Sequence, residues 1–539
     1  MANKKYIFVV GGVMSGVGKG VATASIGKIL QAKGFRITAV KIDPYVNVDA
    51  GTMNPTEHGE VFVLDDGWEC DQDLGNYERF LDKNFTQANC LTTGRVYLSV
   101  INKERALSYG GKCVEVVPHI PLQIIEDIDA AAKKDKAEIV LVEIGGTVGE
   151  YQNILFLEAI RFLKLKHPKD VVTILVSYLP LRNNDNELKT KPTQYAVRTL
   201  NSTGIQPDMV LARASVPLDQ KRKQKIALNC NLEVEDVISA PDVRDVYEMP
   251  LILEKAGISK RILSKLGLKS RKKDLKEWSA LVGRIKRLKK TVRIGIVGKY
   301  FGTGSFILSD SYLSVIESIK HAAYEAGYKP QIDWVDAGNQ GSLSKYHGVV
   351  VPGGFGGRDI EGKIKAIRYA REKKIPFLGL CYGMQLATVE FARNVAGLRG
   401  ANSTEIDKKT KYPVIDVMPE QLEKLQGAKY GGTMRLGAYP ALLKEGAIAR
   451  KAYGTKKISE RHRHRYEVNP EYIERLEEKG LVFSGKSPDG VLMEIAELPK
   501  SKHPFFLGTQ FHPELKSRPL SPHPLFREFI KAALAKKGR

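Results

Sequence analysis

The segment Tyr6–Gly20, YIFVVGGVMSGVGKG, joins a short apolar run to a glycine-rich loop and the start of a helical stretch. The β-branched and aromatic run Tyr6–Val10 predicts a strand, and the pattern after the loop predicts a helix to about Ala32. Glycines let backbone N–H groups approach phosphate oxygens, and a helix N-terminus adds partial positive charge. The segment therefore predicts a strand–loop–helix unit that binds phosphate.

The loop departs at two positions from the pattern G-x-x-x-x-G-K-[ST]. Val13 stands where the first glycine is usual, and Gly20 replaces the hydroxyl residue that would hold Mg²⁺. Lys19 would bring a full charge to the β- and γ-phosphates. The alternative interpretation is a tight strand–helix turn with a surface lysine.

If Gly20 cannot ligate Mg²⁺, carboxylates must do more of that work. Asp73 lies in a loop-like CDQDLG stretch, and Glu143 ends an apolar run just before a Gly-Gly turn. Parallel sheets present ligand groups at such strand ends, and hard oxygen ligands suit Mg²⁺. Loop carboxylates also often only cap helices, so both interpretations stay open. Lys41, at the end of a second strand, is either a second phosphate cation or a lysine at the sheet edge.

Strand-like runs alternate with helical stretches along the chain, which predicts an α/β fold with parallel sheets covered by helices. In the first half these runs are 36–42, 139–143, 171–177 and 208–212. The pattern restarts at 292–298 and continues through 348–351 and 376–380. We expect an N-terminal P-loop-like parallel-sheet domain over 1–267, a basic linker over 268–291 and a C-terminal α/β domain over 292–539.

The 539 residues carry 84 Lys and Arg against 61 Asp and Glu, a formal net charge of +23. Residues 251–300 hold sixteen of these cations and only three acids, so more than half of the surplus lies in one strip. Such a strip is usually a solvated linker or helix face, and less often a surface for RNA, anionic membrane or an acidic ligand.

A hydrophobic content of 43% excludes global disorder. We find no apolar run of about 18 residues, the length that would indicate a membrane span. The N-terminus does not resemble a secretory signal, because its apolar run is short and leads into the glycine loop. The five cysteines are widely spaced and form no CxxC pair. This usage argues against a disulfide framework or a zinc site, and favours a reducing, cytoplasmic location.

The segment 376–385, PFLGLCYGMQ, reads as a strand, a Gly-x-Cys-x-Gly turn and a helix. This is the nucleophile-elbow arrangement with Cys381 as the nucleophile. His512 and Glu514 in QFHPE offer a base and a carboxylate that orients it. Backbone N–H groups of Gly354 and Tyr382 could form an oxyanion hole. The alternative for a cysteine after a strand is an ordinary core residue.

Two further polar stretches stand out. In 460–467, ERHRHRYE, alternation places His462 and His464 on one face, but the interleaved arginines would oppose a metal cation. We expect an edge that faces an anion or substrate near the thiol site. The cationic stretch 189–194, KTKPTQ, could bind a polyphosphate or be an ordinary exposed loop.

Over nearly its full length the chain resembles the CTP synthase family, whose second half is a class I glutamine amidotransferase. The motifs are GGVMSGVGKG, KIDPY, EIGGTVG and KTKPTQ, then GLCYGMQ, PGGFG, ANSTE, GGTMRLG, RHRHRYEV and QFHPE. The resemblance implies ATP-dependent amination of UTP to CTP by a synthase (amidoligase) domain. Glutamine would be hydrolysed at Cys381 through a thioester, with His512 as base and Glu514 orienting it. Ammonia would cross an internal channel and attack C4 after ATP phosphorylates the uracil O4.

The resemblance also implies binding residues. The ATP set would be Gly16, Val17, Gly18, Lys19, Gly20, Val21, Lys41, Asp73, Asp242 and Val243, with Asp73 and Glu143 on Mg²⁺. The UTP and CTP set would be Ser15, Glu150, Tyr151, Gln152, Lys189, Thr190, Lys191, Pro192, Thr193, Gln194 and Lys225. The glutamine set would be Gly354, Tyr382, Gly383, Met384, Gln385, Glu405 and Arg465. A homotetramer, CTP feedback inhibition and GTP activation are implied as well.

Departures from the family pattern bear on regulation. Glu150 and Gln152 stand at two positions that are acidic in the family, and the amide of Gln152 leaves the strength of CTP feedback open. Leu313 replaces a frequent lysine in the loop 299–314, which leaves the dependence on GTP open. One rival hypothesis is an amidotransferase with another acceptor, such as a cofactor amidase. Another is an inactive relative that forms filaments or binds RNA through the basic strip. The complete set of Cys381, His512 and Glu514 argues against it, and the strip has few of the aromatics that stack on single strands.

Overall fold

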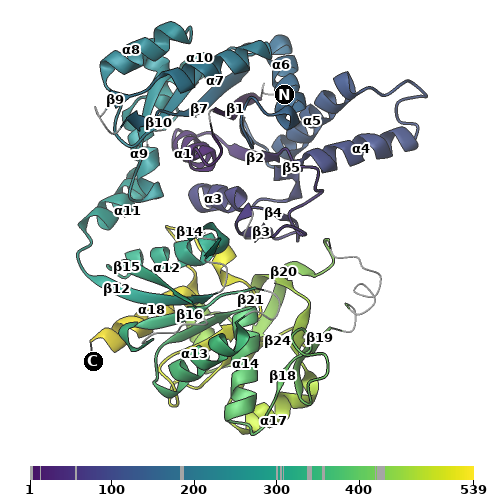
Figure 1. Cartoon of the computed structure of the whole chain (residues 1–539), viewed down its shortest axis with the longest axis vertical. Helices are drawn as coiled ribbons and strands as arrows, with labels where there is room; N and C mark the ends of the chain where they lie inside the picture. Colours follow the sequence, from purple (N-terminus) through teal and green to yellow (C-terminus); the bar gives the residue numbers. More distant parts are fainter. Residues whose placement is uncertain are drawn as a thin grey trace. The chain divides into compact units, whose positions relative to one another are not determined.

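The computed structural model describes residues 4–538 apart from positions 13, 55–57, 183–186, 273, 299–301, 304, 305, 308, 337–342, 355–358, 419, 420 and 422–430. The chain forms two compact units (Figure 1). Unit 1 comprises Met1–Asp49 and Asp73–Val282, and unit 2 comprises Ala50–Gln72 and Gly283–Arg539. Residues 50–72 therefore pack with the second half of the sequence. The predicted division at 268–291 placed them in the N-terminal domain.

Unit 1 contains a seven-stranded sheet in the order β11-β10-β7-β1-β6-β2-β5. All neighbouring strands are parallel, which confirms the predicted parallel sheet. The strands are β1 Lys5–Gly12, β2 Ile37–Asp43, β5 Cys90–Thr92, β6 Ile139–Ile144, β7 Val171–Tyr178, β10 Met209–Ala214 and β11 Val237–Pro241. The central strands are buried along nearly their whole length, as expected where helices cover both faces.

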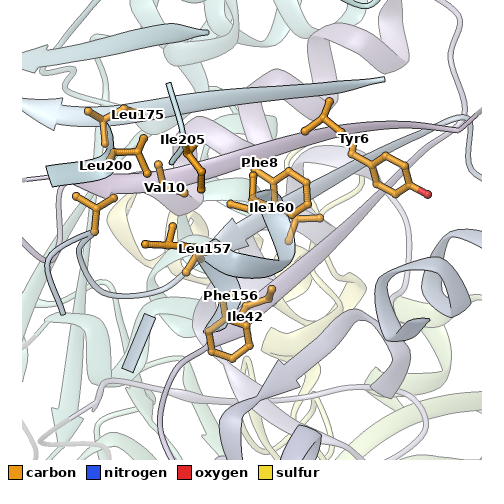
Figure 2. Close-up of a cluster of buried hydrophobic side chains, with 14 of the residues drawn as sticks. Tyr6, Phe8, Val10, Ile42, Phe156, Leu157, Ile160, Leu175, Leu200 and Ile205 are labelled. Atoms are coloured by element: carbon orange, nitrogen blue, oxygen red, sulfur yellow. The ribbon is translucent and has the colours of Figure 1, made fainter. Parts of the chain in front are cut away.

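The core of unit 1 follows the two-residue period of its strands. Figure 2 shows Tyr6, Phe8 and Val10 of β1 beside Phe156, Leu157 and Ile160 of α6. The alternate residues of β1 are buried as well, and α1 packs against β1, β2 and β6. The helices of this unit are α1 Lys19–Ala32, α3 Gln72–Leu81, α4 Thr93–Arg105, α5 Val116–Lys134, α6 Ile154–Lys166, α7 Lys191–Ser202, α8 Gln220–Asn229, α9 Met249–Lys255 and α10 Ile258–Lys265. Helix α11, Lys276–Arg287, spans the division between the two units.

Part of the basic strip packs on unit 1. The guanidinium of Arg271 lies 4.5 Å from the ring centroid of Phe35 and pairs with Glu138 at 2.8 Å. Trp278 of α11 is buried, and its indole N–H donates to the carbonyl of Tyr247 at 2.8 Å. These anchors give the strip a structural role beyond that of a solvated linker.

Unit 2 contains a nine-stranded sheet in the order β15-β12-β16-β17-β25-β24-β23-β20-β21. The strands from β15 to β25 are parallel, as predicted, and those from β25 to β21 are antiparallel. They are β12 Thr291–Gly298, β15 Lys329–Asp336, β16 Gly348–Val351, β17 Phe377–Leu380, β20 Arg435–Leu443, β21 Lys457–His464, β23 Val482–Lys486, β24 Met493–Glu497 and β25 Phe506–Thr509. Strand β21 ends this order and therefore forms an edge of the sheet.

Helices cover both faces of the second sheet. One core cluster lies with α13 Ile360–Glu372 and α14 Tyr382–Asn394, and the other with α12 Leu313–Glu325 and α18 Pro524–Lys537. Residues 50–72 add an antiparallel hairpin of β3 Val61–Val63 and β4 Glu69–Asp71. Among the described residues, no helix is long and apolar enough to cross a bilayer.

Gly20 is required where α1 meets α3. A Cβ atom at position 20 would lie 1.9 Å from Oδ1 of Asp73, so the missing hydroxyl side chain has a steric explanation. We expect Gly20→Ala to lower the free energy of unfolding by about 1–3 kcal/mol, because the carboxylate must move. Urea unfolding measures this change.

Gly283→Ala in α11 is the matched control, since the nearest atom to its new Cβ is 3.5 Å away. This helical substitution should stabilise the protein by about 0.5–1 kcal/mol. Equal effects at positions 20 and 283 would contradict the close packing of Asp73.

Candidate active sites

The predicted phosphate loop leads from β1 into α1. Gly16 and Gly18 have φ angles of 69° and 86°, and Gly18 precedes the first helical residue, Lys19. The Lys19 ammonium is largely buried and donates to the carbonyl of Gly146 at 2.8 Å, beyond the carboxyl end of β6. Burial lowers the pKa of Lys19, and the negative charge of Glu143 acts against this effect. The loop thus holds a cation beside the helix N-terminus, although Val13 lies outside the described residues.

Three carboxylates converge on the ammonium of Lys41. Its Nζ lies 3.1 Å from Oε1 of Glu143 and 3.6 Å from Oδ1 of Asp43, and it contacts Oδ2 of Asp73. The hydroxyl of Tyr77 donates to the other oxygen of Glu143. The sequence predicted Asp73, Glu143 and Lys41 as separate candidates, and the structure brings them together at one end of the sheet.

The protonation of this cluster depends on burial and on Lys41. Burial raises the pKa of Asp43 to about 6. Burial and the charge of Asp73 raise the pKa of Glu143. Burial acts in the same direction on Asp73, but the Lys41 ammonium holds the pKa of Asp73 below its usual value.

Asp73 and Glu143 are suitable ligands for Mg²⁺. Both place carboxylate oxygens around one cationic group, so this cluster already accommodates positive charge. The described residues contain no group of three or more His, Cys, Asp or Glu arranged to hold a metal. Mg²⁺ commonly takes one or two carboxylates and completes its shell with water and phosphate oxygens, so two ligands suffice.

The predicted pyrimidine residues follow the carboxyl ends of neighbouring strands. Glu150 accepts from the backbone N–H of Thr147 at 2.7 Å and from the Gln152 side-chain amide at 2.6 Å, while Tyr151 is 92% exposed. Thr193, near the start of α7, is buried and hydrogen-bonds Ser177 at 2.9 Å. Ser15 lies in the exposed part of the phosphate loop.

Cations gather around Glu187, on the strand that precedes the KTKPTQ stretch. A hydrogen bond from Lys189 lowers the pKa of Glu187, and Arg222 and Lys225 add to the effect. Arg222 lies 3.5 Å from the carboxylate. The structure thus brings Lys189 and Lys225 together, and adds Arg222, which the sequence analysis missed.

A second missed residue lies beside the phosphate loop. Arg213, near the end of β10, donates to Oδ1 of Asp242 at 2.6 Å, and Val243 follows Asp242. Its Nη1 atom lies 2.4 Å from the position of a Cβ atom at Gly18. The available signal was a charged residue, Arg213, directly after the predicted strand 208–212.

The thiol site has the predicted strand–turn–helix geometry. Cys381 follows β17 with φ 49° and ψ −100°, a strained conformation for a residue with a side chain, and α14 starts at the next residue. A Cβ atom at Gly383 would lie 2.1 Å from the carbonyl oxygen of Val351, so only glycine permits this tight turn. The backbone N–H of Cys381 donates to Thr509 of β25 at 2.6 Å.

His512 lies between a carboxylate and the thiol. Its Nδ1 is 2.6 Å from Oε1 of Glu514. Burial acts to lower the pKa of His512, but Glu514 and Cys381 together hold this pKa well above its usual value. The Cys381 Sγ is 3.6 Å from the side-chain amide of Gln510, which the sequence analysis did not single out.

A cavity of about 70 Å³ opens beside these groups. Its lining includes Gly353, Gly354, Tyr312, Cys381 and His512, together with Glu60 and Val61 of the hairpin. Among the predicted glutamine-binding residues, Gln385 is buried and donates to the carbonyl of Tyr466 at 2.9 Å. Arg465 donates to Gln421 at 3.1 Å, and Glu405 is half-buried. Tyr382 and Met384 are buried in the core cluster of α14.

His462 and His464 share one face of β21, as predicted, and their ring nitrogens are 3.0 Å apart. Both side chains are buried and therefore do not face solvent or a substrate. Their neighbours are charged: Arg435 lies 2.7 Å from Glu494 and 3.3 Å from Glu467. Burial holds the pKa of each histidine well below its usual value and raises the pKa of each of the two carboxyl groups. The expected substrate-facing edge is therefore wrong for these two side chains.

The sequence matches two family models. Residues 5–268 match CTP synthase N-terminus, and residues 307–532 match glutamine amidotransferase class-I. A CTP synthase of Methanocaldococcus jannaschii is 52% identical, with 99% of both chains covered, and one of Pyrococcus furiosus is 52% identical, with 98% of both covered. The solved Trypanosoma brucei CTPS glutaminase domain with bound acivicin is 34% identical, with a TM-score of 0.41, and covers 45% of this chain and 94% of that one.

We expect Glu514→Gln to lower the pKa of His512, because the substitution removes the main group that raises it against burial. The imidazolium form should then be lost at lower pH. The pH dependence of Cys381 alkylation by iodoacetamide measures the shift. Glutamine hydrolysis should slow by about 100-fold or more. An unchanged pH profile would contradict the role of Glu514.

Proposed function

The chain belongs to the CTP synthase family and converts UTP to CTP with nitrogen from glutamine, and on this basis we propose how its residues divide the reaction. Unit 2 would release ammonia from glutamine. Unit 1 would use ATP to activate UTP and would attach the ammonia. The observation that carries the first assignment is the placement of His512 between Glu514 and Cys381.

In the glutaminase step, the Cys381 sulfur attacks the amide carbon of glutamine and forms a thioester. His512 gives a proton to the leaving nitrogen, which departs as ammonia. His512 then takes a proton from the water that attacks the thioester carbon. The C–S bond breaks, glutamate is released, and the Cys381 sulfur returns to its starting state beside His512. Backbone N–H groups of Gly354 and Tyr382 stabilise the oxyanion in both halves of the step.

Side chains around the cavity would hold the rest of the glutamine molecule. Arg465 provides a cation for the α-carboxylate, and Glu405 provides an anion for the α-ammonium. The buried amide of Gln385 supports the wall of the pocket through the carbonyl of Tyr466. Gly383 and Met384 would contribute backbone only, since α14 buries the methionine side chain.

In the synthase step, the uracil O4 attacks the γ-phosphorus of ATP, the proton on N3 is lost, and ADP leaves. Ammonia then attacks C4, a proton is lost, and inorganic phosphate departs with the former O4. The loop Gly16–Val21 holds the phosphates through its backbone and the Lys19 ammonium. Asp242 and Val243 form part of the wall of the site that binds the adenine. Mg²⁺ held by Asp73 and Glu143 would neutralise charge on the transferred phosphoryl group. Lys41 would then exchange a carboxylate for a phosphate oxygen.

The pyrimidine nucleotide would lie where three strands end. Cations around Glu187, namely Lys189, Lys225 and the neighbouring Arg222, suit a triphosphate. Residues Ser15, Glu150–Gln152 and Thr190–Gln194 would face the nucleotide from adjacent loops. CTP would compete at the same site as a feedback inhibitor, and Gln152 would present an amide there.

Assembly and activation complete the proposal. A homotetramer is supported by large apolar side chains that unit 1 leaves exposed: Leu98, Ile101, Leu107, Val116, Ile154 and Tyr195. GTP would activate glutamine hydrolysis near the stretch before α12, much of which lies outside the described residues. A cytoplasmic location is supported by the five cysteines, none of which is in a disulfide.

Lys19→Ala tests the phosphate assignment. We expect the variant to lose CTP synthesis from either glutamine or ammonium, and to keep basal glutamine hydrolysis, because the thiol site does not use Lys19. Product formation is followed by chromatography of the nucleotides.

Lys28→Ala on the same helix is the matched control, since its ammonium bonds Gln31 at 3.0 Å and lies 5.3 Å from the ring centroid of Trp278. This control should retain synthesis. CTP formation from ammonium by the Lys19 variant would refute the assignment.

A further inference from the structure

The edge strand β21 holds both members of the thiol site through its backbone. The carbonyl oxygen of Arg463 lies 3.7 Å from the Cys381 Sγ. Two residues earlier, the carbonyl oxygen of Arg461 accepts from the backbone N–H of His512 at 2.7 Å. Alternate residues of an edge strand direct their backbone groups away from the sheet. The spacing of these two carbonyls therefore fixes how far apart the thiol and the imidazole residue are held.

The side chains of the same two arginines are tied to the hairpin of residues 50–72. Nε of Arg461 lies 2.6 Å from Oδ1 of Asp65, and Nε of Arg463 lies 2.8 Å from Oε1 of Glu69. The side chains of Arg461 and Glu69 have no exposed surface. Both pairs lie within unit 2, and neither takes part in the chemistry described above.

Further contacts fix the hairpin to the same strand region. The Arg461 guanidinium lies 5.4 Å from the ring centroid of Phe62 on β3. The backbone N–H of Ala438, opposite Arg461 on β20, donates to the carbonyl of Asp65 at 2.9 Å. The hairpin thus contacts β20 by hydrogen bonding and β21 by charge.

A buried guanidinium is stable only beside a compensating charge, because leaving it uncompensated costs several kcal/mol. The carboxylates of Asp65 and Glu69 therefore determine where Arg461 and Arg463 can lie, and with them the two carbonyls that contact the thiol site. We propose that Asp65 and Glu69 are positioning residues for glutamine hydrolysis, acting through the backbone of β21. This inference rests on the catalytic roles proposed for Cys381 and His512.

The hairpin has a second connection to the thiol site. Its Glu60 lines the cavity and accepts from the backbone N–H of Ser314, in the first turn of α12, at 3.1 Å. The chain then passes from Glu69 to Asp73, the proposed Mg²⁺ ligand, in four residues. The same short segment thus carries contacts of the thiol site and leads directly into a residue of the phosphate site.

Glu69→Gln tests the proposal, because it removes the charge and keeps the size of the side chain. The full-length enzyme is assayed for glutamine hydrolysis and for CTP formation from ammonium. We expect kcat for glutamine to fall about 10- to 100-fold with KM changed less than about threefold, since a small displacement of reacting groups has that effect. Alkylation of Cys381 by iodoacetamide should slow, and CTP formation from ammonium should stay within about twofold.

Asp333→Asn is the matched control. It breaks the Arg293–Asp333 pair of 2.6 Å on β12 and β15, at the opposite edge of the same sheet. We expect its glutaminase kcat to stay within about twofold of the unmodified enzyme. Glu69→Asp, which keeps the charge, should recover part of the rate that Glu69→Gln loses.

A Glu69→Gln kcat within about twofold of the unmodified enzyme would overturn the proposal, and so would equal losses of both activities. If that variant does not fold, Asp65→Asn carries the same test, because the Asp65 side chain is 32% exposed and tolerates the change better. Cys381→Ala separates the failure of the proposed catalytic roles from the failure of the positioning proposal. Glutamine hydrolysis by that variant would refute the catalytic roles, whereas an inactive Cys381→Ala with a fully active Glu69→Gln refutes only the positioning.

Discussion

The backbone of β21 contacts both residues of the thiol site, Cys381 and His512. Cys381 is held on one side by the strained turn between β17 and α14, and on the other by the carbonyl of Arg463. His512 follows β25 and takes its position from the carbonyl of Arg461. Cys381 and His512, the proposed nucleophile and base, thus follow neighbouring parallel strands, and an antiparallel edge strand contacts both of them.

In unit 1 the main electrostatic feature is a cluster of carboxylates around one lysine. Three carboxylates crowd the end of its sheet, and the Lys41 ammonium makes their proximity tolerable. Burial raises the pKa of Asp43 to about 6, and the positive charge of Lys41 acts against this effect. A divalent cation with polyphosphate would meet both needs, by binding the carboxylates and by giving Lys41 a new anionic partner. Gly20 contributes by leaving room for Asp73 against α1.

Much of the fold could be predicted from local sequence, because buried parallel strands are continuous apolar runs and the two glycine turns follow such runs directly. The antiparallel half of the second sheet was missed, since its strands carry charges such as those of 460–465 on buried faces. The hairpin of residues 50–72 could not be placed, because its contacts with Arg461 and Arg463 span almost 400 residues and leave no periodic signal. Arg213 and Arg222 were missed for a similar reason, since each takes part in its site through an ion pair with a distant residue.

We expect nitrogen to be released from glutamine at Cys381 and attached to the pyrimidine elsewhere in the chain. The most direct measurement supplies the Cys381→Ser variant with glutamine labelled with ¹⁵N in its amide, together with unlabelled ammonium, ATP, Mg²⁺ and UTP, and determines the mass of the CTP formed. The unmodified enzyme should incorporate the label, and our prediction for the variant is CTP that contains only unlabelled nitrogen. Labelled CTP from the variant, or a folded variant that forms no CTP from ammonium, would contradict it.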